Sequence, residues 1–311
     1  MDRRRIGSLD VSIIGLGCNN FGRRLDAAAT AEVVNAALDA GIDFFDTADM
    51  YADGLSEEYL GRALAGRRDA AIIATKFGHP RSTFGTGGSA AIVRRAVEGS
   101  LRRLGTDRID LYQLHMPDPS VPIAETLGAL DELVRAGKVR EVGCSNFSAE
   151  QLREAESAAR PGAARFVGVQ NQYSLLHREP EPDVLAECER QGVAFLPFFP
   201  LASGLLTGKY RRGRPLPPGT RLRESSYQSL LTDRNLDVVE SLIAFAESRG
   251  RTILALAVSW LLARPAVAAV IAGATKPGQV RANVAAASWR LTAEELAEVD
   301  EITSRATAGH G

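Results

Sequence analysis

The sequence predicts a closed (β/α)8 barrel, in which eight parallel strands alternate with helices. Eight short apolar runs rich in Val, Ile and Phe alternate with longer segments of helical period. Several helical segments end in a glycine just before the next strand, as at Gly41, Gly137 and Gly192, which is typical of a helix C-terminus. Eight strand–helix units within about 270 residues match the size of such a barrel.

The expected strands leave room for a helix between each pair. They are residues 12–17, 44–47, 71–76, 110–115, 141–146, 166–171, 194–199 and 269–274. Stretches such as "AATAEVVNAALDAG" and "VPIAETLGALDELVRAGK" lie between them and have helical spacing. The segment 203–250 is longer than one connection requires. Its part "GRPLPPGTRLRESSY" is rich in Pro, Gly and Arg, so we expect an exposed excursion before a helix at about 234–249.

A doubly wound open sheet is the rival architecture, and its usual glycine fingerprint is incomplete here. The motif G-x-G-x-x-G normally follows the first strand of such a sheet. This chain reads "GLGCNNFG", with Asn20 at the place of the third glycine. No linker or tandem repeat divides the chain, so residues 1–311 are expected to form a single domain.

Composition disfavours several classes of partner. The chain has 37 Lys and Arg against 38 Asp and Glu, which argues against charge-driven binding to nucleic acid or to a membrane surface. No apolar run reaches the roughly 18 residues of a membrane span. The basic start "MDRRRIGSLD" lacks the apolar stretch of a secretory signal. Three widely spaced cysteines, Cys18, Cys144 and Cys188, suggest no disulfide framework, so we expect a cytoplasmic protein.

Polar side chains follow the apolar strands at their carboxyl ends. The stretch "GIDFFDTADMY" begins as a buried strand and then turns polar, with Asp46, Asp49 and Tyr51 close together. The other strand-end residues are Lys76, His115, Ser145, Asn146, Gln170, Asn171, Thr275 and Lys276. Any one of them alone is more often a solvated loop residue. Because barrel active sites lie at this end of the strands, the whole set predicts a site.

Asp46, Tyr51, Lys76 and His115 form a chemically coherent set. A free tyrosine has a pKa of about 10 and is a poor acid at neutral pH. The ammonium of Lys76 would stabilise the phenolate of Tyr51 and lower that pKa, while Asp46 would hold Lys76 in place. His115 could donate a hydrogen bond to a substrate oxygen, although a lone histidine beside a strand is more often a core residue. The set suits carbonyl reduction, with the hydride supplied by a cofactor.

Other chemistries fit less well. The stretch "GCSNF" has Phe147 where a nucleophile elbow requires a second glycine. In "SGLLTGKY", three residues rather than four separate Gly204 from Gly208, and Tyr210 follows Lys209 in place of the Ser or Thr of a phosphate-binding loop. No H-E-x-x-H occurs, and no zinc site is expected from the widely spread histidines His79, His115, His177 and His310.

The chain resembles the aldo-keto reductases over nearly its whole length. The most specific stretches are "GIDFFDTADMYADGLSEEYLGRAL", "LYQLHMPDPSVPIAETLGALDELVRAGKVREVGCSNFS" and "FLPFFPLASGLLTGKY". The resemblance implies a (β/α)8 barrel with an N-terminal β-hairpin and extra C-terminal helices. It also implies reversible reduction of a small-molecule aldehyde or ketone with NADPH. The family's catalytic tetrad falls on Asp46, Tyr51, Lys76 and His115, with Tyr51 as the proton donor.

The same resemblance implies a set of cofactor contacts. The nicotinamide amide contacts fall on Ser145, Asn146 and Gln170, and the stacking position falls on Phe198, where many members have tyrosine. The residues that match the pyrophosphate and adenosine sites are Leu201, Ser203, Lys209, Gly273, Thr275, Lys276, Gln279 and Asn283. The best-known mammalian members have Lys and Arg at the places of Gly273 and Gln279. Lys276 is then the cation left to bind the 2′-phosphate of NADPH.

Two other functions stay open at this point. Some members of the family act as cofactor-sensing regulatory subunits with weak catalysis, against which the intact tetrad argues. A metal-dependent sugar isomerase would require several carboxylates and histidines at the strand ends, where this chain has Asp46 and His115. The substrate pocket is expected from the loops 18–21, 77–84 and 211–230. Its candidate side chains are Phe21, Phe77, Phe84 and Tyr227, and Arg81, Arg211 and Arg212, which either bind an anionic substrate or are solvated.

Overall fold

The structure is a computed structural model that describes residues 1–308, so His310 and the end of the expected domain 1–311 lie outside the described residues. Within this part of the chain, eight parallel strands pair in the order β10-β3-β4-β5-β6-β7-β8-β9. They are β3 (Ile14–Gly17), β4 (Phe44–Asp46), β5 (Ile72–Phe77), β6 (Ile109–Leu114), β7 (Val139–Ser145), β8 (Phe166–Gln172), β9 (Ala194–Phe198) and β10 (Val270–Gly273). A bridge between Phe195 and Val267 joins β9 to the segment before β10. The predicted (β/α)8 barrel is confirmed.

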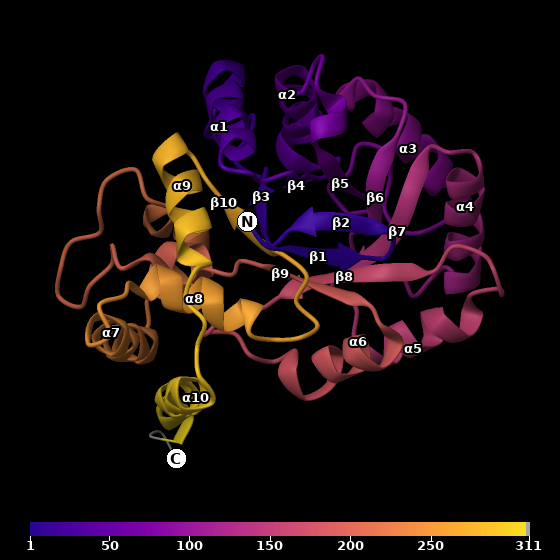
Figure 1. Cartoon of the computed structure of the whole chain (residues 1–311). Coiled ribbons are helices and arrows are strands. Elements are labelled where there is room, and N and C mark those ends of the chain that lie inside the picture. The colour runs from indigo at the N-terminus through magenta and orange to yellow at the C-terminus, as the bar shows by residue number, and fades with distance from the viewer. Residues whose placement is uncertain (309–311) are drawn as a thin grey trace.

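Helices surround the barrel and connect its strands (Figure 1). The helices of the eight strand–helix units are α1 (Ala27–Asp39), α2 (Leu55–Ala63), α3 (Ala90–Leu104), α4 (Ile123–Arg135), α5 (Ala149–Ala158), α6 (Ala186–Gln191), α8 (Ile253–Leu262) and, after the last strand, α9 (Pro277–Ala286). Two further helices are α7 (Asp233–Glu247), inserted before α8, and α10 (Ala293–Ala308) at the C-terminal end. Gly41, Gly137 and Gly192 have φ values of 82°, 72° and 66°, which is the left-handed conformation expected after a helix.

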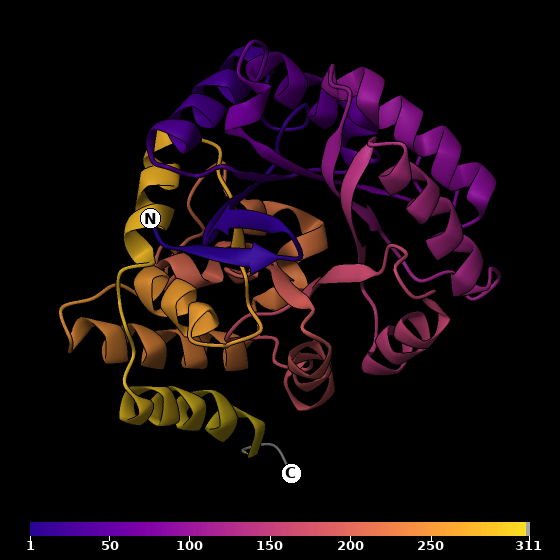
Figure 2. The ribbon, with the colours of Figure 1, turned by 45° about the vertical axis from the view of Figure 1, so that its right-hand side comes forward.

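An antiparallel hairpin of β1 (Arg3–Ile6) and β2 (Leu9–Ser12) lies across one end of the barrel (Figure 2). Its side chains Ile6, Leu9 and Val11 pack against residues near the amino ends of the barrel strands, Phe44 among them. The expected strand 12–17 is therefore split, because Ser12 pairs with Arg3 in the hairpin. The opposite end of the barrel stays free for the strand-end loops.

Successive side chains of each barrel strand point alternately to the inside of the barrel and to the surrounding helices. Phe44 and Leu111 belong to the inner core, whereas Phe45 and Tyr112 pack in the core beneath the helices. The side chains two positions after Phe44 and Leu111 therefore also point into the barrel. In β4 that residue is Asp46, which is how an apolar strand delivers a carboxylate to the barrel interior.

No helix in the described part of the chain is long and apolar enough to cross a membrane.

Candidate active site

Four strands carry a polar side chain into the barrel near its carboxyl end. Asp46 ends β4, and Lys76, Gln113 and Gln170 lie near the ends of β5, β6 and β8. All four are buried, and Gln113 is 0% exposed. Sequence reasoning missed Gln113, although a polar residue inside an apolar strand, two places before His115, was the available signal.

Asp46 is the acceptor at the centre of this group. The ammonium Nζ of Lys76 lies 2.8 and 2.7 Å from its two carboxylate oxygens, and Nε2 of Gln170 donates to it at 2.9 Å. Gln113 adds a longer hydrogen bond of 3.4 Å. Burial by itself acts to lower the pKa of Lys76, but Asp46 opposes it and the pKa is raised overall. Lys76 therefore keeps its charge at neutral pH.

Tyr51 lies beside this ion pair, at the start of the helical turn Tyr51–Gly54 that follows β4. The Nζ of Lys76 is 5.3 Å from the centre of the tyrosine ring, and the ring of His115 packs edge-on at 6.1 Å. Burial raises the pKa of Tyr51, and Lys76 opposes that effect without reversing it. The expected lowering by Lys76 is thus present, but the net direction is upward because ionisation of the phenol is penalised away from water.

His115 follows β6 and is 9% exposed. Burial lowers the pKa of His115 to about 2, and the charge of Lys76 acts in the same direction, so the ring is neutral. Its Nδ1 is buried without a hydrogen-bond partner in the described structure. We assign the proton to Nε2, because a donor at Nδ1 would have no acceptor there.

Hydrogen bonds connect the ends of β7 and β8 to residues of the predicted tetrad. The hydroxyl of Ser145 donates to the carbonyl of Gln170 at 2.7 Å, and the side-chain amide of Asn146 donates to the carbonyl of His115 at 3.0 Å. Because Gln170 also donates to Asp46, Ser145 is linked to the Lys76–Asp46 pair through Gln170, while Asn146 is linked to His115.

Backbone strain is concentrated at this end of the barrel. Non-glycine residues with positive φ lie in the loops that follow β4, β7 and β9. Within the described chain they are Ala52, Asp53, Asn146, Phe199, Ala202 and Ser203. This conformation is unfavourable for residues with a side chain and clusters at functional sites. The strain therefore marks the same face as the polar side chains do.

The loop after β9 carries the residues expected at the pyrophosphate. Phe198 ends the strand and is partly exposed, and Leu201 is partly buried. Ser203, with a φ of 56°, is buried in the short helical segment Ala202–Thr207. Lys209 is exposed, with its Nζ 5.1 Å from the centre of the Tyr210 ring and no ion pair to a described residue.

The residues expected at the adenosine lie between β10 and α9. Lys276 precedes the first turn of α9 in extended conformation, and Pro277 occupies the first helical position, where its missing N–H costs no hydrogen bond. The side-chain oxygen of Gln279 accepts hydrogen bonds from the backbone N–H and the hydroxyl of Thr275, at 2.7 and 3.1 Å. Gly273 is exposed and Asn283 is buried. Lys276 is exposed and has no ion pair within residues 1–308.

The expected exposed excursion folds back onto the loop after β3. Arg221 donates to the side-chain oxygen of Asn20 at 2.9 Å, and Glu224 forms ion pairs with Arg23 and Arg24. Leu222 is 0% exposed. Asn20 itself donates to the carbonyl of Ala274, which links this loop to β10. No local sequence signal connects residues two hundred positions apart.

Most of the aromatic residues expected in the pocket are packing residues. Phe21 and Phe77 are 0% exposed, and Phe77 stacks on Tyr112 at 4.7 Å. Phe84 lies under the guanidinium of Arg103, 4.6 Å from its ring centre. These rings serve the core rather than the strand-end face.

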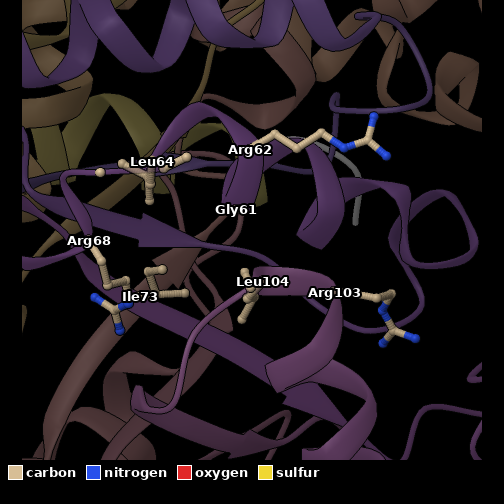
Figure 3. A pocket seen from close by; sticks show the side chains of 10 residues that line it. Gly61, Arg62, Leu64, Arg68, Ile73, Arg103 and Leu104 are labelled. Carbon is tan, nitrogen blue, oxygen red and sulfur yellow. The ribbon is translucent and has the colours of Figure 1, made fainter.

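A cavity of about 290 Å³ lies elsewhere, between α2 and α3 (Figure 3). It is lined by residues that include Gly61, Leu64, Ile73 and Leu104, and by Arg62, Arg68 and Arg103. Ile73 is near the start of β5, so the cavity lies away from Lys76 at the strand's other end. Arg68 and Arg103 are already paired with Asp110 and Glu57. Within the described residues, no three His, Cys, Asp or Glu side chains are grouped to hold a metal.

The sequence profile of the Aldo/keto reductase family matches residues 13–304. The chain belongs to the aldo/keto reductase family. It is 37% identical over 306 residues to the aldo-keto reductase YhdN of Bacillus subtilis, covering 94% of this chain and 90% of that protein. It is 34% identical over 276 residues to a probable voltage-gated potassium channel subunit beta of Oryza sativa, with 86% and 84% covered. It is 32% identical over 299 residues to the L-glyceraldehyde 3-phosphate reductase of Escherichia coli, with 91% and 86% covered.

Aldo/keto reductases are oxidoreductases that act on small-molecule carbonyl compounds and generally use NAD(P)H. The resemblance on which the tetrad was assigned is thereby confirmed at the level of the family.

Proposed function

We propose that the chain reduces an aldehyde or ketone reversibly with NADPH, and that Tyr51 donates the proton to the carbonyl oxygen. The observation that supports this most directly is the buried ammonium of Lys76 beside Tyr51. It is held by Asp46 at 2.7 Å and lies 5.3 Å from the phenol ring. A fixed positive charge stabilises a forming phenolate most strongly where water is excluded.

The proton chemistry rests on the chain's own residues. Tyr51 keeps its proton at neutral pH, because its pKa is raised by burial. After the proton has moved to the substrate oxygen, the charge on Tyr51 is stabilised by Lys76. Gln170 and Gln113 donate to Asp46 and so fix the carboxylate that holds Lys76. His115 donates from Nε2 to the same substrate oxygen without carrying a charge of its own.

The strand-end face suits a dinucleotide. NADPH, when bound, supplies the hydride. The hydroxyl of Ser145 and the amides of Asn146 and Gln170 suit the nicotinamide amide, and the partly exposed Phe198 suits stacking. For the rest of the cofactor we propose Leu201, Ser203, Lys209, Gly273, Thr275, Lys276, Gln279 and Asn283. Lys209 and Lys276 support this, because both are exposed cations without an ion pair in the described chain.

The likeness to a potassium channel subunit beta supports a second candidate, a cofactor-sensing subunit with weak catalysis. The two functions differ in turnover rather than in cofactor binding. Tight NADPH binding with no turnover on any aldehyde of a broad panel would favour the sensing role.

The test is Tyr51→Phe, assayed by NADPH absorbance with an aldehyde panel at saturating cofactor. We expect kcat to fall by about 10²–10⁴-fold, the usual contribution of a general acid, with NADPH affinity within about twofold of wild type. Tyr59→Phe on α2 is the matched control, since Tyr59 contacts Arg62 on the helix and should leave kcat unchanged. A Tyr51→Phe enzyme that kept more than about half of kcat would exclude Tyr51 as the proton donor.

A further inference from the structure

The loop after β5 begins with a tight turn of four residues, His79 to Ser82. The backbone N–H of Ser82 donates to the carbonyl of His79 at 2.8 Å, and the backbone N–H of Arg81 donates to Nδ1 of His79 at 3.1 Å. Pro80 is at the second position, where its fixed φ suits such a turn. The turn follows Lys76 by three residues and therefore lies at the strand-end face.

Both ends of this turn are anchored to the candidate active site. The ring of His79 lies 4.8 Å from the ring of His115, tilted by 56°. At the other end, the hydroxyl of Ser82 donates at 2.5 Å to Asp49, which is 0% exposed and lies two residues before Tyr51. The position of Arg81 between these anchors is thus set by the site.

Arg81 differs from the other two arginines considered as substrate ligands. Arg211 pairs with Glu240 at 2.7 Å, and Arg212 pairs with Asp237 at 2.6 Å. Arg81 is exposed, and its guanidinium has no hydrogen bond or ion pair to any residue that the structure describes. Burial is the main cause that lowers the pKa of His79 and of His115, and the charge of Arg81 acts in the same direction on both rings. Arg81 is therefore an uncompensated cation within electrostatic reach of the candidate catalytic histidine.

We propose that Arg81 binds an anionic group, a carboxylate or a phosphate, on the carbonyl substrate and so selects anionic over neutral carbonyl compounds. This inference rests on the proposed reductase function. A guanidinium offers paired N–H donors that match the oxygens of either anion. Lys76 cannot take this role, because its ammonium is committed to Asp46. The ring of His79 links the two positions: its Nδ1 accepts from the backbone N–H of Arg81 at 3.1 Å, and its centre lies 4.8 Å from that of the His115 ring.

The inference is tested with pairs of aldehydes that differ in one charge. The probes are 4-carboxybenzaldehyde and its methyl ester, succinate semialdehyde and butanal, and glyceraldehyde 3-phosphate and glyceraldehyde. For wild type we expect kcat/KM to favour the anionic member of at least one carboxylate or phosphate pair by about tenfold or more. In Arg81→Gln this preference should be lost through KM, with kcat and the neutral aldehydes within about twofold. Arg81→Lys should keep part of the preference.

The control variant is Arg212→Gln, which removes an exposed arginine that already has a carboxylate partner and should leave the preference unchanged. The preference of wild type should also weaken as ionic strength rises. Equal kcat/KM values for anionic and neutral members of all pairs would overturn the role of Arg81. An equal loss of kcat/KM for the anionic and the neutral aldehydes in Arg81→Gln would also overturn this role. If wild type reduced none of the aldehydes, the proposed reductase function itself would fail, and the inference with it.

Discussion

Replacing Asp49 by asparagine is expected to stabilise the protein at neutral and alkaline pH. Asp49 is 0% exposed, its Oδ2 accepts a hydrogen bond of 2.5 Å from Ser82, and its Oδ1 has no hydrogen-bond partner in the described structure. Burial raises the pKa of this carboxyl from 3.8 to about 6, against the opposing effect of Ser82. The ionised carboxylate is therefore unfavourable in the folded protein.

The size of the effect follows from the two pKa values. A difference of about 2, at about 1.36 kcal/mol for each unit, makes ionised Asp49 destabilising by roughly 3 kcal/mol. Because the folded pKa is the higher one, the folded state binds the proton more tightly than the unfolded chain. Stability is therefore lost as pH rises from about 4 to about 6 and stays lower above that range. Asparagine has nearly the same shape and no charge, so it avoids this loss.

Urea denaturation of wild type and Asp49→Asn at several pH values from about 4 to about 8 measures the difference. The free energy of unfolding of the variant should be close to that of wild type at about pH 4. At about pH 8 it should exceed that of wild type by up to about 3 kcal/mol. Ser82→Ala is the companion variant. It removes a donor to the carboxylate and should destabilise the protein more at about pH 8 than at about pH 4. A difference between wild type and Asp49→Asn that is the same at every pH would refute the reasoning.

Three further outcomes are expected. Lys76→Met should leave Asp46 buried without its counter-charge, which costs about 3–5 kcal/mol of stability, and should change the shape of the pH dependence of kcat/KM; an unchanged profile at an unchanged rate would remove Lys76 from the mechanism. Since the pKa of His115 is lowered to about 2, the rate of reduction should show no titration of this ring above about pH 5. A change of rate at about pH 6.5 that His115→Gln abolishes would contradict the assignment of a neutral His115 ring. Lys276→Ala should weaken the affinity for NADPH by at least about tenfold and the affinity for NADH by less than about twofold, measured in fluorescence titrations at fixed ionic strength. Equal losses of affinity for the two cofactors would show that Lys276 does not bind the 2′-phosphate.

The strand order and the residues at the strand ends could be predicted from the sequence, because their signals are local. Each of these signals depends only on residues that are close in the sequence, whether it is an apolar run, helical spacing or a glycine such as Gly41 or Gly192. In a parallel barrel these local signals place every strand end on one face, which is why Asp46, Lys76 and His115 could be grouped before their contacts were known. The roles within that group came from the family resemblance rather than from the residues alone.

The interior of the site needed the tertiary structure. Gln113 became part of it through a hydrogen bond to Asp46, 67 positions away in the chain. The pKa of Tyr51 depends on the balance between burial and the charge of Lys76, and burial prevails because the barrel and its loops cover much of this half-buried side chain. Spacing in the sequence contains no measure of that exclusion.

The sequence by itself determined the barrel, its order of elements and the set of polar residues at one rim. Only the tertiary structure decided which of them are paired. Among residues 1–308 it pairs Arg211 and Arg212 with carboxylates and leaves Arg81 without one, and it folds the predicted exposed excursion onto Asn20. The physical reason is that secondary structure follows from periodicity within a few residues. Ion pairing and desolvation depend instead on side chains that come together from distant parts of the chain.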